Sequence, residues 1–185
     1  LYRFDTRPAG TEHSATILFS GPSHSAARWA REELAAKYGV GAELWSATSY
    51  KKLREQALDA ERWTRLNPGD ARSVDVTEKL NTTEGPIVAV SDYMTIVPDQ
   101  ISRWAPRSFV PLGTDGFGRS DTREVLRTFF EIDGPNVVVA VLSSLANQGA
   151  ISVDVVTQAI TDYGIDNTRT NPFQFETGPA LPANQ

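Results

Sequence analysis

The chain has 185 residues, of which 40% are hydrophobic and 22% charged, and its formal net charge is −5 at pH 7. This composition is ordinary for a globular domain with a buried core, and the acidic balance gives no support to a nucleic-acid or anionic-membrane partner. The chain has no cysteine, which excludes disulfides, thiolate metal sites and cysteine nucleophiles. No uninterrupted apolar run approaches the ~18 residues that cross a bilayer, so we expect no membrane partner.

The sequence begins with Leu1 instead of Met, and no basic segment followed by an apolar one marks a secretory signal. We therefore expect a piece of a longer protein, either cut or expressed as a fragment. The absence of cysteine is compatible with a reducing cytosol, so the expected location is cytoplasmic.

Five short runs of apolar and β-branched residues predict β-strands along the chain. They are Tyr2–Phe4, Thr16–Ser20, Glu43–Ala47, Ile87–Ser91 and Phe109–Leu112. Apolar residues at helical spacing predict helices between and after these runs. The predicted helices cover 25–38, the stretch from a cap at Thr48 or Ser49 to Leu66, 74–80, 97–104, 121–130 and 152–163. Gly39 is predicted to end the first helix in a left-handed conformation, and Ser152 to cap the last.

The run Val137–Leu142 fits two structures. Its consecutive β-branched residues have the propensity of a buried strand. Val138, Val141 and Leu145 also have helical spacing, and the run continues without a break. From the residues alone, a strand and a helix are about equally well supported for this run.

Strands that alternate with helices predict an α/β fold with a mainly parallel sheet and helices on both faces. In such a sheet, the loops at the carboxyl ends of the strands meet at one edge. The loops predicted to meet there are Gly21–Ser25, Thr48–Ser49, Ser91–Tyr93 and Gly113–Arg119. We find no repeat or linker, so we expect one domain over residues 1–172 and an extended or mobile tail over 173–185.

The stretch from Leu112 to Glu124 is the main candidate for a functional site. It follows a predicted strand, precedes a predicted helix and carries three glycines within six residues. Asp121, with Glu124 three residues later, predicts a capping box at the helix start. Such a loop either packs closely against another segment or presents backbone N–H groups to an anion.

The charges and glycine spacing of this stretch favour packing over anion binding. Arg119, Arg123 and Arg127 are suited to an anion near a helix start. However, carboxylates are interleaved with these arginines and cancel much of their charge. The glycines lack the Gly-x-Gly-x-x-Gly spacing of dinucleotide-binding loops, and no Lys-Ser/Thr pair of a P-loop follows. We therefore predict an internally salt-bridged packing loop.

Few other residues are candidates for catalysis or binding. Trp63 stands beside Glu61 and Arg62, a composition common at protein interfaces. His24, in a loop after a strand, is expected to have a structural or solvent-exposed role. We find no metal-ligand cluster and no nucleophile–base arrangement, so no catalytic, cofactor-binding or metal-binding residue is assigned. The structural or interface candidates are Gly113, Asp115, Gly116, Phe117, Gly118, Arg119, Asp121, Arg123 and Trp63.

Four motifs occur in an order that is typical of one enzyme family. They are Tyr38-Gly39-Val40-Gly41, the Glu61-Arg62-Trp63 triplet followed by Asn67-Pro68, Ser91-Asp92-Tyr93-Met94, and the long glycine motif Leu112–Glu124. With these motifs the chain, from Tyr2 to Pro172, resembles the C-terminal region of the homodimeric, thiamine-diphosphate-dependent pyruvate dehydrogenase component.

The resemblance implies a fold similar to the C-terminal domain of transketolase. That fold is a three-layer α/β/α sandwich with a five-stranded mixed, mostly parallel sheet whose first strand runs antiparallel. The five predicted strands match that count. The resemblance also implies that Val137–Leu142 is helical, against its propensity.

The resemblance further implies an activity, cofactors and partners for the full-length parent. That subunit oxidatively decarboxylates pyruvate and passes the acetyl group to lipoamide on the dihydrolipoyl acetyltransferase component of the pyruvate dehydrogenase complex. Thiamine diphosphate and Mg²⁺ bind between its first two domains, so none is expected in this fragment. The implied partners are the other domains of the same polypeptide, a homodimer partner and the acetyltransferase component.

We expect this fragment to be an organising and dimer-supporting domain that is inactive alone. One alternative is a self-sufficient α/β domain that binds a nucleotide or phosphorylated metabolite at the edge formed by Gly21–Ser25 and Gly113–Arg119. A second alternative keeps the family and gives the domain a regulatory or docking role toward the acetyltransferase component.

Overall fold

The computed structural model describes residues 1–174, and the rest of the predicted tail, 175–185, lies outside the described residues. The described chain forms a five-stranded sheet with the strand order β1-β3-β2-β4-β5. The strands are β1 (Tyr2–Asp5), β2 (His13–Phe19), β3 (Val40–Ser46), β4 (Ile87–Val90) and β5 (Phe109–Leu112). β1 pairs antiparallel with β3, and the other pairs are parallel. The predicted mixed, mostly parallel sheet is confirmed.

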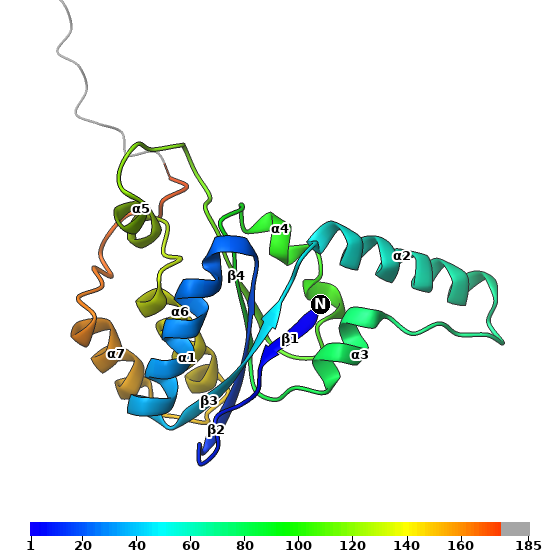
Figure 1. Cartoon of the computed structure of the whole chain (residues 1–185), viewed down its shortest axis with the longest axis horizontal. Coiled ribbons are helices and arrows are strands. Elements are labelled where there is room, and N and C mark those ends of the chain that lie inside the picture. The colour runs from blue at the N-terminus through cyan, green and yellow to red at the C-terminus, as the bar shows by residue number, and fades with distance from the viewer. Residues whose placement is uncertain (175–185) are drawn as a thin grey trace, which may run out of the picture.

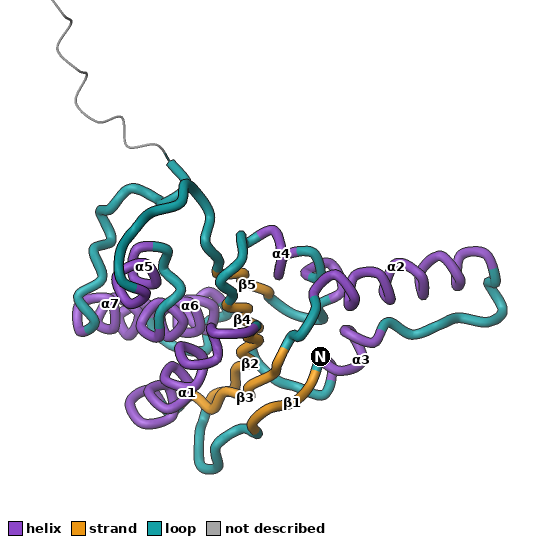
Figure 2. The backbone as a smooth tube through the Cα atoms, turned by 45° about the horizontal axis from the view of Figure 1, so that its top comes forward, coloured by secondary structure: helices purple, strands orange, loops and turns teal. Residues whose placement is uncertain are grey.

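Helices lie on both sides of this sheet, which gives three layers (Figure 1). One side has α1 (His24–Tyr38), α6 (Gly134–Asn147) and α7 (Val153–Asp162). The other side has α2 (Tyr50–Leu66), α3 (Asp75–Asn81) and α4 (Ile96–Asp99). The short helix α5 (Arg123–Phe129) lies above α6 and α7 in both views (Figures 1 and 2).

The side chains of the central strand β2 alternate between two separate cores. Ile17 and Phe19 belong to a buried cluster with α1 and α6, whereas Leu18 belongs to a cluster with α2 and α3. Because both faces of the sheet are covered, β4 and the second half of β2 are buried at every residue instead of at alternate ones.

Short-range signals predicted most helix ends correctly. Gly39 has a φ of 63° and ends α1, and the side chains of Ser49 and Ser152 accept backbone hydrogen bonds at the starts of α2 and α7. The helix predicted at 97–104 is wrong in one respect. It is α4 followed by a separate 3₁₀ turn at Ser102–Trp104, because successive i→i−3 hydrogen bonds tighten the chain there.

The run at 137–142 is the middle of α6, so the helix implied by the resemblance is confirmed and the strand alternative is wrong. Asp133 caps this helix, because its Oδ1 atom accepts a hydrogen bond from the Asn136 N–H at 3.1 Å. Pro135 stands in the first turn, where its missing N–H has no intrahelical partner to lose. The buried apolar side chains form one stripe in the core with α1: Val137, Val138, Val141, Leu142 and Leu145.

One stretch, 123–147, is long and apolar enough to cross a membrane by length and composition alone, because the mean hydropathy of an 18-residue window within it is 1.3. The search for uninterrupted apolar runs in the sequence had found no segment long enough to cross a bilayer, because polar residues interrupt this stretch. In the structure the stretch is divided into α5 and α6 by a turn in which Glu131 has a φ of 59°. Its most apolar part, 44% of which is buried, includes the stripe of α6 that packs in the core.

Candidate functional site

Three of the four predicted loops meet at the carboxyl edge of the sheet, around Asp92. The Ser23 hydroxyl donates to Asp92 Oδ1 at 3.1 Å, and the Thr114 hydroxyl donates to the Asp92 carbonyl oxygen at 3.0 Å. Arg127 Nη2 lies 3.5 Å from Asp92 Oδ2. The fourth loop, Thr48–Ser49, starts α2 and has no hydrogen bond to the other three among the described residues. Asp92 therefore joins the loops that follow β2, β4 and β5.

The glycine-rich loop, residues 113–122, packs against backbone at two of its glycines. A Cβ atom on Gly113 would lie 2.5 Å from the Tyr93 carbonyl oxygen and 2.6 Å from the Thr95 nitrogen. Gly116 has a φ of 112°, and a Cβ there would lie 2.4 Å from the Pro172 carbonyl oxygen. Gly118 has no such neighbour within 4 Å. Close backbone approach thus explains the first two glycines and not the third.

The charged residues of the loop do not form the predicted internal salt bridges, so that expectation is wrong. Asp115 accepts hydrogen bonds from the Thr95 N–H, at 3.0 Å, and from the Thr95 hydroxyl. The Arg119 guanidinium lies 4.0 Å from the centroid of the Phe129 ring. Within the described residues, the ion pair between Arg127 and Asp92 is the only one formed by the stretch 113–127.

The predicted capping box is also corrected, by one residue. Thr122 is the N-cap of α5, because its side chain accepts a hydrogen bond from the Val125 N–H at 3.4 Å. The Asp121 carboxylate accepts a hydrogen bond from the adjacent Thr122 N–H at 2.7 Å. Asp121 therefore stabilises the turn before the helix and does not cap its first turn.

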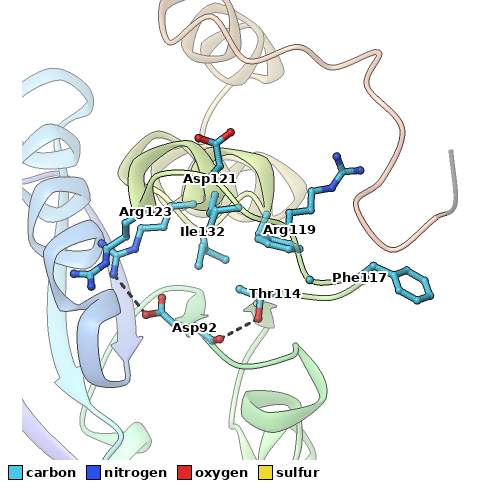
Figure 3. Close-up of a pocket in the computed structure, with 12 residues that line it drawn as sticks. Asp92, Thr114, Phe117, Arg119, Asp121, Arg123 and Ile132 are labelled. Carbon is cyan, nitrogen blue, oxygen red and sulfur yellow. Dashed lines mark hydrogen bonds and ion pairs between the residues drawn. The ribbon is translucent and has the colours of Figure 1, made fainter. Parts of the chain in front are cut away.

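A cleft of about 440 Å³ lies between the glycine-rich loop, α5 and Asp92 (Figure 3). Leu126, Phe130 and Ile132 give it an apolar lining, and Figure 3 shows Ile132 near its centre. Arg119, Arg123 and Arg127 also line it, together with the carboxylates of Asp92 and Asp121. Since the two carboxylates offset two of the three guanidinium charges, the charged side chains that line the cleft carry a net charge of only +1. Its chemistry suits packing better than binding of a strong anion.

Exposed apolar side chains lie on the glycine-rich loop and on the segment 93–96 beside it. Phe117 is 63% exposed and points away from Asp92 in Figure 3. Three more side chains, on the segment that packs against Gly113 and Asp115, are 55–61% exposed: Tyr93, Met94 and Ile96. We call these four residues the carboxyl-edge patch. The sequence analysis named only Phe117, although Ser91-Asp92-Tyr93-Met94 had been singled out as a motif, because exposure depends on the tertiary fold.

Two other candidates take no part in the contacts around Asp92. His24 begins α1, and its ring packs edge-on against Phe4 and Phe19, with centroids 5.6 and 5.7 Å away, which is a structural environment. Trp63 lies near the end of α2, on the opposite side of the sheet from α5 (Figure 1). Its indole N–H donates to the Asp70 carbonyl oxygen at 3.0 Å, so it holds the following loop against the helix.

Glu61, next to Trp63, connects α2 to the body of the protein. It accepts hydrogen bonds from the Arg103 guanidinium and, at 2.7 Å, from the Trp104 indole N–H. These two donors hold the pKa of Glu61 below its ordinary value of 4.5. Because the folded-state pKa is lowered, the contribution to stability is present above pH 4.5 and is lost as the pH falls through the folded-state value.

We therefore expect Glu61→Gln to weaken the acid dependence of folding. Between about pH 5 and pH 3, the wild-type chain should lose more of its free energy of unfolding than the variant does. Urea unfolding at a series of pH values measures this difference. Glu78→Gln, which removes an exposed carboxylate of α3, is the matched control and should follow the wild type. If the free energy of unfolding changed with pH equally in Glu61→Gln and the wild type, the contribution assigned to the Glu61 contacts would be wrong.

The fold and this edge define the class of protein. The family model described as the transketolase-like TK C-terminal domain matches residues 1–133, and the chain belongs to this family. The described fold also resembles a solved split-gene transketolase, described as an inactive β4 tetramer, with a TM-score of 0.50 and 21% identity. That match covers 74% of this chain and 41% of the transketolase chain, and it supports the fold alone.

Within this family, the chain is similar to pyruvate dehydrogenase E1 components. It is 41% identical over 175 residues to the component of Pseudomonas aeruginosa, which covers 94% of this chain and 20% of that protein. It is 45% identical over 178 residues to the component of Corynebacterium glutamicum, a match that covers 96% of this chain and 19% of that protein. It is 40% identical over 174 residues to the component of Escherichia coli K12, a match that covers 93% of this chain and 19% of that protein. The chain thus spans about a fifth of these relatives.

These comparisons confirm the resemblance that the four motifs indicated. They give no support to the alternative of a self-sufficient domain that binds a nucleotide or phosphorylated metabolite at the Gly21–Ser25 and Gly113–Arg119 edge. The geometry agrees, because Arg127 and Asp92 neutralise each other between these two loops.

Proposed function

We propose that this chain is the C-terminal domain of a thiamine-diphosphate-dependent pyruvate dehydrogenase (acetyl-transferring) subunit. The whole subunit would oxidatively decarboxylate pyruvate and transfer the acetyl group to lipoamide on the dihydrolipoyl acetyltransferase component. The observation that carries this proposal is 40–45% identity to pyruvate dehydrogenase E1 components over 93–96% of the chain. The proposed location is the cytoplasm, where the pyruvate dehydrogenase complex of a bacterium would act.

The proposed role of the domain within that subunit is organising. The carboxyl-edge patch and the glycine-rich loop would pack against the neighbouring domains and help to support a homodimer. Two features support this role: the loop packs closely against backbone at Gly113 and Gly116, and exposed apolar side chains lie beside it. Exposed apolar side chains that lie near one another often mark interaction sites on proteins.

The cofactors are proposed to bind to other parts of the parent. Thiamine diphosphate supplies the carbanion-stabilising chemistry of such enzymes and needs Mg²⁺ to hold its diphosphate. In residues 1–174, no group of three His, Cys, Asp or Glu side chains could hold a metal ion. We assign no described residue of this chain to a magnesium diphosphate site and derive no catalytic step from them.

Calorimetric titration with thiamine diphosphate and Mg²⁺ tests this proposal. We expect saturable binding to the full-length subunit and none to the 185-residue chain, since the proposed cofactor site is formed by other domains. Pyruvate-dependent activity of the full-length subunit provides the second measurement. Saturable binding to the short chain at micromolar concentration would refute the organising role, and a full-length subunit without activity on pyruvate would refute the enzymatic one.

A further inference from the structure

The second half of α2 and the loop after it project from the body of the protein as an arm. Figures 1 and 2 both show α2 extending away from the sheet, with the loop returning to α3. The buried residues of α2 end at Ala60. We call residues 62–73 the arm tip. None of these residues is fully buried, so the arm tip adds nothing to either core.

Although it has no core, the arm tip is held in a fixed conformation by polar contacts. The Arg72 guanidinium stacks 3.5 Å from the centroid of the Trp63 ring, while the Trp63 indole N–H is bonded to Asp70. The Arg72 N–H donates to the Thr64 hydroxyl at 3.0 Å, and the Asn67 amide donates to the Trp63 carbonyl oxygen at 3.0 Å. A preorganised surface loses less conformational entropy when it binds a partner.

The composition of the arm tip fits a particular kind of partner. It contains three arginines and a single acidic residue, Asp70, so its net charge is +2 in a chain of net charge −5. Arg62 and Arg65 are exposed and form no ion pair with a residue that the structure describes. Leu66, beside them, is 58% exposed. Exposed cations around an apolar side chain are complementary to an acidic surface with an apolar centre.

The arm lies on the side where the chain enters the domain. Leu1 packs in the same core as Tyr50 and Leu53 of α2 and Leu80 of α3. Figures 1 and 2 show the N-terminus beside α3. In the relatives, of which this chain spans about a fifth, a longer polypeptide is present. Polypeptide that precedes Leu1 would approach the domain beside the arm.

We propose that the arm tip docks onto an acidic surface of the part of the same polypeptide that precedes Leu1. This inference rests on the proposed function, because it needs a parent subunit with further domains. It adds a second contact, separate from the carboxyl-edge patch and on the other side of the sheet. Arg62 and Arg65 would pair with carboxylates of that surface, and Leu66 would contact an apolar side chain between them.

Photo-crosslinking in the full-length subunit tests the docking. Leu66 is replaced by p-benzoylphenylalanine, the subunit is irradiated, and the linked peptides are identified by mass spectrometry. We expect a link to a peptide upstream of Leu1 that contains Asp or Glu, on a band with the mass of a single polypeptide. The same probe at Val153, which is 66% exposed on α7, is the positional control and should not link to that peptide.

The charge requirement is tested in the same assay. Replacing both Arg62 and Arg65 by Ala should reduce the yield of this link by about fivefold at low salt, because two ion pairs are lost. Raising the ionic strength should reduce the wild-type yield in the same direction. Replacing Lys51 and Lys52 by Ala removes two exposed cations from the start of the same helix and should leave the yield unchanged.

The outcomes separate this proposal from the proposed function. A link only to the partner subunit, a link to no upstream peptide, or a yield that ignores Arg62 and Arg65 would overturn the docking. Activity on pyruvate is measured on the same preparation. An active subunit without the upstream link leaves the proposed function intact and refutes the docking alone, whereas an inactive subunit that forms the link refutes the enzymatic function alone.

Discussion

Gly113→Ala should destabilise the chain by about 3 kcal/mol, close to the upper end for added volume at a packed site. The new methyl group would meet backbone atoms on several sides: the Tyr93 carbonyl oxygen at 2.5 Å, the Thr95 nitrogen at 2.6 Å and the Met94 carbonyl carbon at 2.9 Å. Backbone cannot rotate away as a side chain can, so the two segments must separate. Thermal unfolding measures the effect, which for a chain of this size corresponds to a fall in Tm of roughly 6–12 °C.

Gly118→Ala is the matched control for this prediction, since it adds the same methyl group to the same loop. A Cβ atom at Gly118 has no neighbour within 4 Å. We expect a change in stability within about 0.5 kcal/mol of the wild type. Similar unfolding temperatures for the two variants would show that the contact between the glycine-rich loop and the segment 93–95 does not stabilise the fold.

Leu142→Ala should also cost about 3 kcal/mol, because it removes a fully buried side chain and leaves a cavity in the core. Leu142 lies on the stripe of α6 that packs in the core with α1. The loss should appear as a lower urea midpoint with an unchanged slope. Asn147→Ala, at the exposed end of the same helix, should change the midpoint little. Equal effects of the two substitutions would contradict the helical register of α6.

The five strands and the helices on both faces of the sheet followed from periodicity and turn signals, whereas the strand order was not predicted and the strand ends were imprecise. β2 begins at His13, three residues before the predicted start, because His13 to Phe19 pair in continuous parallel register with Val40 to Ser46. Polar residues such as His13 and Ser14 have no strand pattern of their own, so only the partner strand reveals them. α6 depended on a local signal that was not weighed, the Asp133 cap followed by Pro135.

The candidate site was predictable in position and only partly in structure. The glycine-rich loop was located from its sequence, but Tyr93 and Pro172, which explain Gly113 and Gly116, are about 20 and 56 residues away along the chain, too far for a local rule to find. Interleaved charges suggested salt bridges, yet Asp115 binds the Thr95 N–H and hydroxyl instead. A sequence gives the charge of a carboxylate and not the donor that it will meet.

The glycine-rich loop forms no ion pair with a residue that the structure describes, and this has a consequence for measurements in solution. Packing of Gly113 and Gly116 against backbone depends on shape, which dissolved ions do not screen. Attraction between exposed charges is instead screened beyond a Debye length, which is about 10 Å at 0.1 M salt and shorter at higher salt. The carboxyl edge should therefore keep its geometry from dilute buffer to molar salt. Any response of the assembled subunit to ionic strength would then report on other surfaces, and Arg62 and Arg65 of the arm tip are the first to examine.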